Sequence, residues 1–370
     1  MMSNILVNFS KANVGGGKSI LINFLEHSHK LNEHKYFIIT PDYNKYKSFT
    51  KNNIYILDIK KIYLKNTFFI FFYCYYIQKL IKRNEIDLIF NFGDVIIPTK
   101  RKQVYYFDWA YAVYGENYLW ERMSVKDVLL RKTKIFLIGR YIKKLSLVIV
   151  QSQNINDRIR KKYNINKLIT MPTPVNFTGN NVKFADKEKY NVDKLKIFYP
   201  ASFFSHKNFE IIISLANDIK RLNKGHIIYL TLNKESSEDF FLKIKELKLN
   251  NQIKNLGRLN LEEIQKVYRE SDIVVIPSLL ESFGLTYYES MYYRKPVVAS
   301  NLDFAKVACK NAALYFDPFN SIDILDKIEV TFKDDMLNLR LDRGEEIVKE
   351  LPKWEETMML FEKEINSVLR

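Results

Sequence analysis

Two glutamates placed around a glycine form the most suggestive chemical pattern of the chain. The apolar run Ile273–Ile276 predicts a buried strand, and Glu281 follows in a loop. Gly284 permits backbone angles that other residues avoid, and a helix that carries Glu289 is predicted to begin near Leu285. The N–H groups at such a helix start bind anions, including a diphosphate. The glutamates could hold opposite ends of one ligand, or they could be a solvated loop residue and an N-terminal helix charge.

A second phosphate-binding pattern lies near the amino terminus. Gly15–Gly17 precede Lys18 and Ser19, after an expected strand and before an expected helix. A phosphate-binding loop of nucleoside triphosphatases reads similarly, but it opens with a glycine where this chain has Ala12. Three interpretations remain open: such a loop, a glycine turn that approaches the phosphates of another ligand, and a connection without a ligand.

The elements that must position these residues follow an α/β pattern. Short apolar runs alternate with longer amphipathic segments, which is typical of mostly parallel sheets. In the first half we predict strands at 5–9, 36–39, 87–92, 103–107 and 147–151, and in the second half at 196–199, 227–232, 253–256, 273–276, 296–299 and 313–316. Two such units in succession predict two Rossmann-like domains, which bind ligands at the carboxyl ends of their strands.

We predict a domain boundary in the stretch that follows Pro172 and Pro174. Prolines break helices and stiffen the chain, and a polar stretch follows them to about residue 192. We therefore predict a first domain at 1–185, a second at 186–352 and a final helix at 353–370.

Charge is distributed unevenly along the chain of 370 residues. Residues 1–200 carry 34 basic and 15 acidic residues, whereas residues 201–370 carry 24 and 27. The first half therefore faces something anionic, either a nucleic acid or a membrane surface. No zinc finger, RNA-recognition motif or helix-turn-helix is recognisable, so we expect no nucleic-acid partner.

Two segments could contact a membrane surface. The longest apolar run, residues 68–77, is too short to span a bilayer, so it is either a buried helix or an interfacial one. Residues 132–144 mix basic and apolar residues in a helical stretch, which is either an anionic-membrane contact or an ordinary helix with one solvated face. With only two cysteines and no secretory leader pattern, we expect a cytoplasmic protein, peripheral on the inner membrane face.

The sequence segments around the two glutamates resemble those of a known family. Residues 281–289 closely resemble the E-x7-E motif of family-four retaining glycosyltransferases of the GT-B fold, the glycosyl transferases group 1. Similar segments lie at 256–259, 294–300 and 312–318, and residues 199–208 look like the variant of the family's lysine loop that contains His-Lys-Asn. The resemblance is specific over about residues 145–320, and the helix from Trp354 looks like the family's segment that crosses back to the first domain.

The resemblance implies two facing Rossmann-like domains and a role for each matching residue. Glu289 would hold the ribose of a nucleotide-sugar, Glu281 would contact the donor sugar as a catalytic group, and Lys207 would neutralise the diphosphate. Backbone donors to the sugar and diphosphate would come from Ser282, Phe283, Gly284 and Leu285. From the first domain, Gly16 and Gly17 would approach the phosphates, which accounts for the glycine run.

The chain departs from the family pattern at two positions. The family often has an arginine five residues before the lysine, where this chain has Ser202; His206 or Arg258 are candidates to compensate. The family often has a histidine after a first-domain strand, where we find Asp108. Asp108 would then be a catalytic substitute for that histidine, or else a turn or helix-capping aspartate.

These observations predict a retaining glycosyltransferase that moves a sugar from a UDP- or GDP-linked donor to a glycan, with a lipid-linked glycan as the favoured acceptor. The reaction would belong to cell-surface polysaccharide or lipopolysaccharide synthesis and would need no metal or other cofactor, because a lysine and a helix start stabilise the leaving group. The alternatives are a phosphate-loop NTPase or kinase that uses Lys18 and Ser19, and a non-catalytic protein that binds a nucleotide-sugar.

Overall fold

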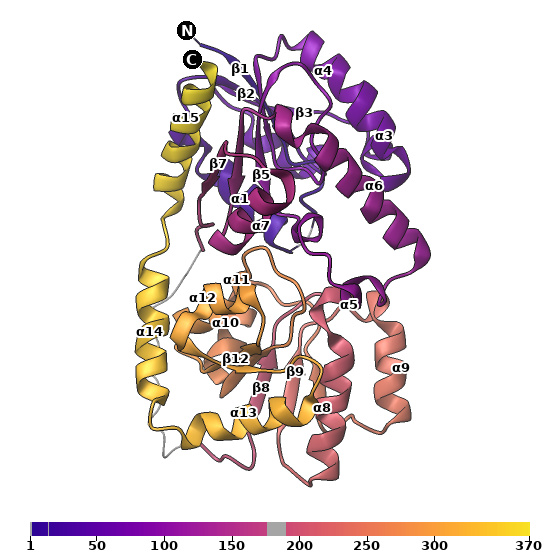
Figure 1. Cartoon of the computed structure of the whole chain (residues 1–370), viewed down its shortest axis with the longest axis vertical. Coiled ribbons are helices and arrows are strands. Elements are labelled where there is room, and N and C mark those ends of the chain that lie inside the picture. Colours follow the sequence, from indigo (N-terminus) through magenta and orange to yellow (C-terminus); the bar gives the residue numbers. More distant parts are fainter. Residues whose placement is uncertain (1, 14, 176–189) are drawn as a thin grey trace. The chain divides into compact units, whose positions relative to one another are not determined.

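The computed structural model describes residues 2–13, 15–175 and 190–370 (Figure 1). The chain forms two compact units. The first comprises Met1–Gly115, Ser124–Pro174 and Pro352–Arg370, and the second comprises Glu116–Met123 and Val175–Leu351. The predicted boundary between residues 185 and 186 lies outside the described residues.

The first unit is built on a parallel sheet. In the part of the chain that the structure describes, its strands follow the order β3-β2-β1-β4-β5-β6-β7. The strands are β1 Asn4–Asn8, β2 Lys35–Ile39, β3 Ile54–Leu57, β4 Leu88–Asn91, β5 Lys102–Phe107, β6 Leu147–Val150 and β7 Leu168–Thr170. The helices are α1 Gly15–Glu26, α2 Tyr43–Tyr46, α3 Phe69–Phe71, α4 Ile77–Arg83, α6 Val125–Tyr141, α7 Gln153–Tyr163 and α15 Trp354–Leu369.

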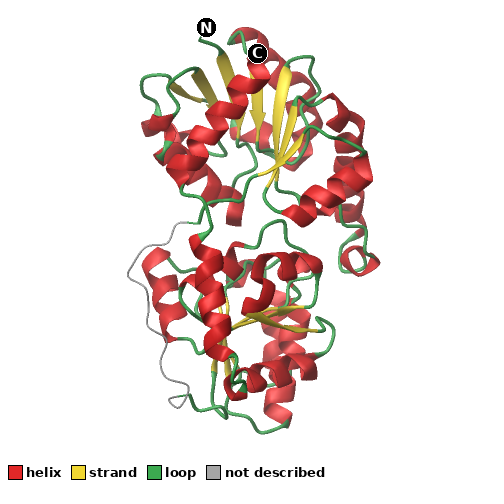
Figure 2. Cartoon of the chain, turned by 60° about the vertical axis from the view of Figure 1, so that its left-hand side comes forward, coloured by secondary structure: helices red, strands yellow, loops and turns green. Residues whose placement is uncertain are grey.

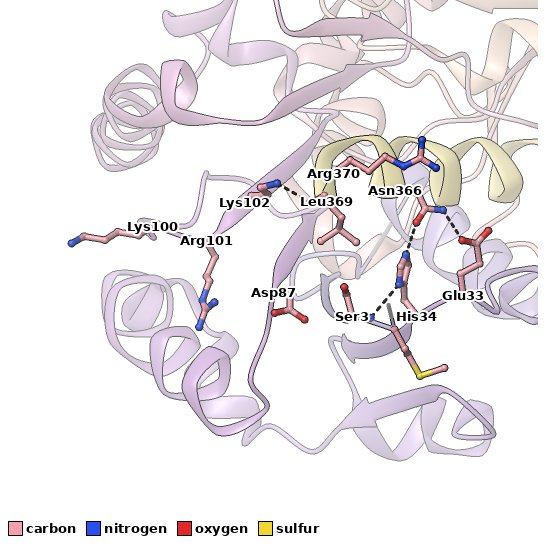
Figure 3. Close-up of a pocket in the computed structure, with 11 residues that line it drawn as sticks. Ser3, Glu33, His34, Asp87, Lys100, Arg101, Lys102, Asn366, Leu369 and Arg370 are labelled. Atoms are coloured by element: carbon pink, nitrogen blue, oxygen red, sulfur yellow. Dashed lines mark hydrogen bonds between the residues drawn. The ribbon is translucent and has the colours of Figure 1, made fainter.

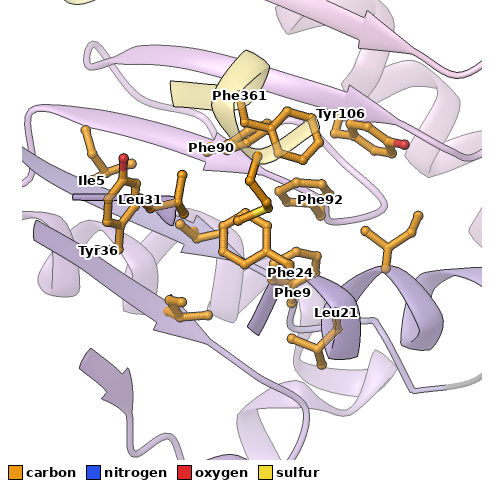
Figure 4. Packing of buried hydrophobic residues seen from close by; sticks show 14 of the residues in the cluster. Ile5, Phe9, Leu21, Phe24, Leu31, Tyr36, Phe90, Phe92, Tyr106 and Phe361 are labelled. Atoms are coloured by element: carbon orange, nitrogen blue, oxygen red, sulfur yellow. The ribbon is translucent and has the colours of Figure 1, made fainter. Parts of the chain in front are cut away.

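Alternate residues of each strand point to opposite faces of this sheet, so the unit has two cores. On one face, aromatic residues of the strands pack with α1 and α15; Phe9 stacks on Phe92 with ring centroids 4.2 Å apart, and Phe361 of α15 joins them (Figure 4). On the other face, Leu6 and Ile89 pack against α3, α4 and the partly buried side of α6. The C-terminal helix therefore completes the first unit, as predicted.

The second unit repeats the design. Within its described residues the sheet is again parallel, with the order β10-β9-β8-β11-β12-β13 (Figure 2). Its strands are β8 Lys196–Tyr199, β9 Ile227–Leu230, β10 Ile253–Asn255, β11 Ile273–Ile276, β12 Val297–Ser300 and β13 Ala313–Phe316. Its helices are α5 Asn117–Trp120, α8 Phe209–Arg221, α9 Glu238–Glu246, α10 Leu261–Glu270, α11 Leu285–Tyr292, α12 Asp303–Cys309, α13 Ser321–Lys333 and α14 Leu337–Lys349.

The prediction of two Rossmann-like domains is confirmed, because both sheets are parallel and doubly wound. Both strand orders reverse direction once, between β1 and β4 in the first sheet and between β8 and β11 in the second. Such a reversal point, at the carboxyl ends of the strands, is where ligands bind in this class of fold. Among the described helices, none combines the length and the apolarity needed to cross a bilayer.

The segment Glu116–Met123 was predicted to lie in the first domain but packs with the second unit. Tyr118 lies edge-on against Phe319, with ring centroids 5.2 Å apart. Arg122 donates to the side chains of Asn208 and Glu210, at 3.0 and 2.9 Å. Contacts with residues far along the chain decide this placement, so the local sequence gives no sign of it.

Candidate active site

The reversal point of the second sheet brings two loops together. One follows β8 and leads to Lys207, and the other follows β11 and carries Glu281. The backbone N–H of Leu279 donates to the carbonyl of His206 at 2.8 Å, which ties the loops to each other. Residues 74 apart in the sequence are thereby placed side by side at the ligand-binding edge of the sheet.

A lysine and a glutamate meet at this point. Lys207 Nζ lies 2.5 Å from Glu281 Oε1, and the two side chains are only 17% and 11% exposed. The Tyr199 hydroxyl donates to the carbonyl of Lys207 at 2.7 Å, which fixes the backbone beneath the lysine. The pair places an amino group and a carboxyl group where a charged ligand would enter.

Asn208 anchors the lysine loop from the other side. It is fully buried, it has a left-handed backbone (φ 56°, ψ 47°), and it is the N-cap of α8. Its side-chain amide donates to the carbonyl of Pro318 at 2.8 Å, and its side-chain oxygen accepts from Arg122. Arg122 could not be predicted as part of this site, since 86 residues separate it from Asn208.

The start of helix α11 is shaped to receive an anion. Gly284 has φ 78°, and a Cβ there would lie 2.5 Å from ring atoms of Tyr287, so both backbone angle and space require glycine. The N–H groups of Phe283, Gly284 and Leu285 donate no hydrogen bond to the part of the chain that the structure describes. The first turn contains no acidic residue that would compete for these donors. The predicted diphosphate site is thus geometrically available.

Side chains beside this helix start are firmly packed. Phe283 is buried and stacks on Tyr288 with centroids 4.5 Å apart, and Ser282 is partly buried beside Glu281. A rigid loop of this kind presents its backbone donors in a fixed direction. That rigidity favours binding, because little conformational entropy is lost when a ligand is held.

Glu289 lies in the second turn of α11. The Tyr268 hydroxyl donates to its Oε2 at 2.9 Å, and no described residue donates to its Oε1. Burial raises the pKa of this carboxyl, and the Tyr268 hydroxyl acts in the opposite direction. One carboxylate oxygen is therefore held in place while the other remains available to a hydroxyl of a ligand.

The two residues proposed to compensate for the missing arginine lie at different places on the same sheet edge. His206 belongs to the lysine loop, where its ring stacks on Phe204 with centroids 5.6 Å apart. Arg258 is exposed in the loop after β10, which is separated from β8 by β9. The structure thus joins His206 to the Lys207–Glu281 pair and leaves Arg258 two strands away.

The first unit has its own group of charged residues at its reversal point. A small cavity of about 30 Å³ is lined by Phe9, Lys11, Ala12, Gly17, Ile20, Phe92, Asp94 and Asp108. A Cβ on Gly17 would lie 3.9 Å from Asp108 Oδ2, so these two predicted residues are neighbours. Burial, and then the nearby Asp94, raise the pKa of Asp108 from 3.8 to about 7.

Helix α1 begins at Gly15, so Gly16, Gly17 and Lys18 are helical residues. A loop that wraps a phosphate needs those glycines outside the helix, with their N–H groups turned inward. This geometry disfavours a nucleoside triphosphate loop. The geometry is compatible with a simpler role, in which the glycine-rich start of α1 lets a ligand approach the backbone closely.

Asp108 has charged neighbours that the sequence does not predict. Asp94 follows β4 and pairs with Lys134 of α6 at 2.6 Å, and the lysine is buried. Burial lowers the pKa of Lys11 in the same place. Only the position of Asp94 in the sequence could have predicted its place in this cluster. It comes two residues after the predicted strand 87–92, at the sheet edge where Rossmann-like domains bind ligands.

Comparisons with known proteins assign the second unit. Residues 182–349 match the family described as glycosyl transferases group 1. The matched region is similar to a group 1 glycosyltransferase domain. It contains the Lys207–Glu281 pair, the α11 start and Glu289.

Sequence relatives cover part of the chain. The O-antigen chain mannosyltransferase RfbU of Salmonella typhimurium is 23% identical over 185 residues, which is 50% of this chain and 50% of RfbU. The chain spans half or less of the length of the curated relatives it matches.

Solved structures match the whole fold. A glycosyltransferase from Rickettsia africae has a TM-score of 0.69 at 19% identity and covers 98% of both chains. Anabaena Alr3699/HepE in complex with UDP and glucose has a TM-score of 0.70 at 15% identity and covers 99% of this chain and 100% of that one. The predicted family resemblance and GT-B fold class are confirmed, while the role of each site residue stays a prediction.

A wide hollow in the first unit lies away from these residues. About 910 Å³ in volume, it is lined by residues such as His34, Lys102, Asn366 and Arg370 at the amino ends of the strands and on α15 (Figure 3). His34 contacts Asn366 across it at 2.8 Å. Ligands of doubly wound sheets bind at the opposite, carboxyl edge, so the Lys207–Glu281 site and the Asp108 cluster remain the candidate sites.

Proposed function

We propose that this protein is a retaining glycosyltransferase that moves a sugar from a nucleotide-sugar to a lipid-linked glycan during synthesis of a cell-surface polysaccharide. One observation carries the proposal. Within the segment that matches the family, the Lys207–Glu281 pair lies beside a helix start whose N–H groups have no described acceptor. That combination suits a ligand with a diphosphate at one end and a hydroxyl-rich sugar next to it.

The geometry suggests how the donor is held. The diphosphate takes the N–H groups at the start of α11, and Lys207 turns from Glu281 to the phosphate oxygens. Glu281 is then released to accept hydrogen bonds from the sugar, and Glu289 accepts from the ribose through its available oxygen. An arrangement of this kind exchanges one ion pair for another, so the lysine does not stay buried without a partner.

The reaction then moves charge toward groups that are already in place. The bond between the anomeric carbon and the diphosphate oxygen breaks, and a bond from an acceptor hydroxyl to that carbon forms. Negative charge grows on the departing diphosphate, where Lys207 and the helix start stabilise it. We propose that these groups replace a divalent metal in that role. The proton of the acceptor hydroxyl leaves with the nucleoside diphosphate or passes to a carboxylate.

Asp108 is the proposed contribution of the first unit. A carboxyl group with a pKa of about 7 exists in both protonation states near neutral pH. It can therefore accept a proton or donate a hydrogen bond under working conditions, which suits a catalytic group. Gly17 beside it leaves room for a ligand to reach the carboxyl.

Two relatives support the choice of substrates. The printed name of RfbU describes transfer of mannose in the O-antigen chain, a surface glycan. The HepE structure contains UDP and glucose. We therefore propose a UDP- or GDP-linked sugar as donor, a glycan as acceptor, and a place at the cytoplasmic face of the membrane.

Thermal stabilisation by nucleotides tests the proposal. A ligand that binds only the folded protein raises the melting temperature by mass action. We expect UDP or GDP to stabilise the protein equally with EDTA and with magnesium, and Lys207→Met to remove the effect while the exposed control Lys245→Met keeps it. Stabilisation by ATP alone, and only with magnesium, would overturn the proposal in favour of a nucleoside triphosphatase.

Product analysis separates an enzyme from a binding protein. With the stabilising nucleotide linked to a sugar, we expect release of the nucleoside diphosphate and a product with the anomeric configuration of the donor. Nucleotide binding without any release would show a non-catalytic binding protein.

A further inference from the structure

Helix α6 exposes large apolar side chains on the side away from its sheet. Val125, Leu129 and Phe136 are 86%, 67% and 69% exposed. Their spacing of four and seven residues places them in one stripe along the helix. Soluble helices normally bury such a stripe, so its exposure requires an explanation.

Basic residues lie on the same stripe. Lys132, Arg140 and Lys143 fall at helical spacing among the apolar residues, and all three are exposed. The chain has six basic residues and no acidic one between Asp127 and Asp157. Within the described residues these three make no ion pair. The outward side of α6 therefore combines positive charge with apolar surface.

A second exposed apolar stretch adjoins the helix. Phe68, Ile70, Phe71 and Tyr75 are between 39% and 62% exposed. On the other side of the same stretch, Phe69, Phe72 and Tyr73 are buried in a core against which Leu130 and Leu137 of α6 pack. Figure 1 shows α3, α4 and α6 together at one side of the first unit. This stretch is thus a half-buried helix with one apolar face in solvent, and six basic residues without an acidic one lie between Asp58 and Glu85.

We propose that this surface docks on a bilayer that contains anionic lipid. The surface, called here the basic apolar face, comprises Val125, Leu129, Lys132, Phe136 and Arg140 of α6, Lys143 in the turn that follows it, and Phe68, Ile70, Phe71 and Tyr75. Apolar side chains enter the boundary between headgroups and acyl chains, while lysines and arginines contact anionic headgroups. Both contributions are needed, because either one alone gives weak, reversible binding.

Charge argues for a bilayer rather than a second copy of the chain. Two copies that met through this face would bring their lysines and arginines together without acidic partners. A purely electrostatic partner such as a nucleic acid would leave the apolar stripe of Val125, Leu129 and Phe136 unused. An anionic bilayer satisfies the charges and the apolar side chains at once.

The inward side of α6 connects this surface to the reversal point of the first sheet. Lys134, on the opposite side of the helix from Phe136, pairs with Asp94 next to Asp108. A helix that lies on the membrane therefore also borders the Asp108 cluster. This part of the inference rests on the proposed function, since it would bring the cluster near a lipid-linked acceptor.

Vesicle co-sedimentation tests the proposal with the full chain. The probes are vesicles of phosphatidylcholine alone and vesicles of equal parts phosphatidylcholine and phosphatidylglycerol. We expect binding only to the second kind, with an affinity that falls as salt rises. Leu129→Ser with Phe136→Ser should weaken binding by about tenfold, and Lys132→Glu with Arg140→Glu and Lys143→Glu by more than about tenfold.

Matched changes on the second unit provide the controls. Leu242 and Val330 are 52% and 47% exposed, so their replacement by serine removes similar apolar surface. Lys243→Glu with Lys245→Glu and Lys254→Glu changes the net charge equally. These control variants should bind vesicles as the unaltered protein does, and an unchanged melting temperature confirms that each variant is folded.

Three results would overturn the docking proposal: no binding to anionic vesicles, equal binding of face variants and controls, or a dimer in sedimentation velocity that the face variants abolish. The last result would assign the face to a second copy. Nucleotide binding is measured separately, so vesicle binding in a protein that transfers no sugar would refute the proposed function and leave this inference standing.

Discussion

The two sheets of this protein have the same plan and different chemistry at the same topological place. Each order reverses once, between β1 and β4 in the first unit and between β8 and β11 in the second. At the second reversal lie Lys207, Glu281 and a helix start with available N–H groups. At the first lie Asp94, Asp108 and a helix start rich in glycine.

The difference indicates that strand order sets where a ligand can bind, whereas side chains set which ligand binds there. A lysine with backbone donors suits the diphosphate of a donor. Two neighbouring carboxyls, one of them with a pKa of about 7, suit a hydroxyl group that loses or shares a proton. The first 200 residues are strongly basic overall, yet two carboxyls gather at their reversal point, beside Lys11 and Lys134.

A pair of lysine variants tests the comparison most strongly. Lys207 and Lys134 each pair with a carboxylate at a reversal point, at 2.5 and 2.6 Å. Lys207→Met should lower the rate of sugar transfer by about 100- to 1000-fold, because it removes the cation that stabilises the leaving diphosphate. Lys134→Met should change nucleotide affinity by less than about twofold, since Lys134 binds Asp94 and is not proposed to contact the nucleotide.

Titration calorimetry with UDP and GDP and a transfer assay measure both effects. Lys134→Met should instead lower the free energy of unfolding, because Asp94 loses its partner in a partly buried place. Equal loss of nucleotide affinity in the two variants would contradict the assignment of nucleotide binding to the second sheet alone.

Replacing Glu289 sharpens the assignment of the second sheet. Glu289→Gln keeps the shape but weakens a charged acceptor, and we expect nucleotide affinity to fall by about tenfold. The matched control is Glu270→Gln, at an exposed position of the same unit. If the variant loses affinity by the same factor for a nucleoside diphosphate and for pyrophosphate, which has no ribose, Glu289 does not bind the ribose.

Asp108 predicts a pH dependence for the first sheet. The folded protein holds this proton more tightly than the unfolded chain, whose carboxyl has the ordinary pKa of 3.8. The stabilising contribution is therefore complete below pH 3.8 and is lost as the pH rises toward about 7 and beyond.

Asp108→Asn removes that dependence. We expect the variant to be more stable than the unaltered protein at pH 8, by up to about 4 kcal/mol, and to show no such gain at pH 4. Urea unfolding at both pH values measures the difference, and Asp58→Asn, at an exposed position in the same unit, is the control. A gain that is equal at both pH values would contradict a raised pKa.

The smallest expected effect concerns the segment Glu116–Met123. Arg122→Ala removes the donor to Asn208, which anchors the loop of Lys207. We expect the KM for the donor to rise by about threefold with kcat almost unchanged, because an exposed ion pair contributes little and the loop is only loosened. Glu210→Gln keeps the bond to Asn208 and is the control; an equal change in both variants would assign the effect to the Arg122–Glu210 pair.

Much of the second unit could be predicted from the sequence. The strands Lys196–Tyr199, Ile273–Ile276 and Ala313–Phe316 begin and end where the apolar runs do. Fully buried parallel strands leave such continuous runs, and Gly284 marks the turn that only glycine can make.

The first unit was harder to predict. Strands β3 and β7 were missed because they are short, with four residues in Ile54–Leu57 and three in Leu168–Thr170. Helix α1 begins four residues before the predicted start at Ser19, and its glycine-rich first turn was missed because glycine has low helix propensity.

By itself, the sequence determined the α/β class, the carboxylates Glu281 and Glu289, and the uneven charge, because these depend on residue type and on spacing along the chain. Only the tertiary structure decided that Lys207 meets Glu281, that Asp94 lies beside Asp108, and that Arg122 reaches Asn208. These contacts join residues far apart in the sequence, and the cost of desolvating charged groups decides which of them must pair. The exposed side of α6 also depends on tertiary structure. The helical spacing of its apolar residues can be read from the sequence, but only packing shows which side of the helix faces solvent.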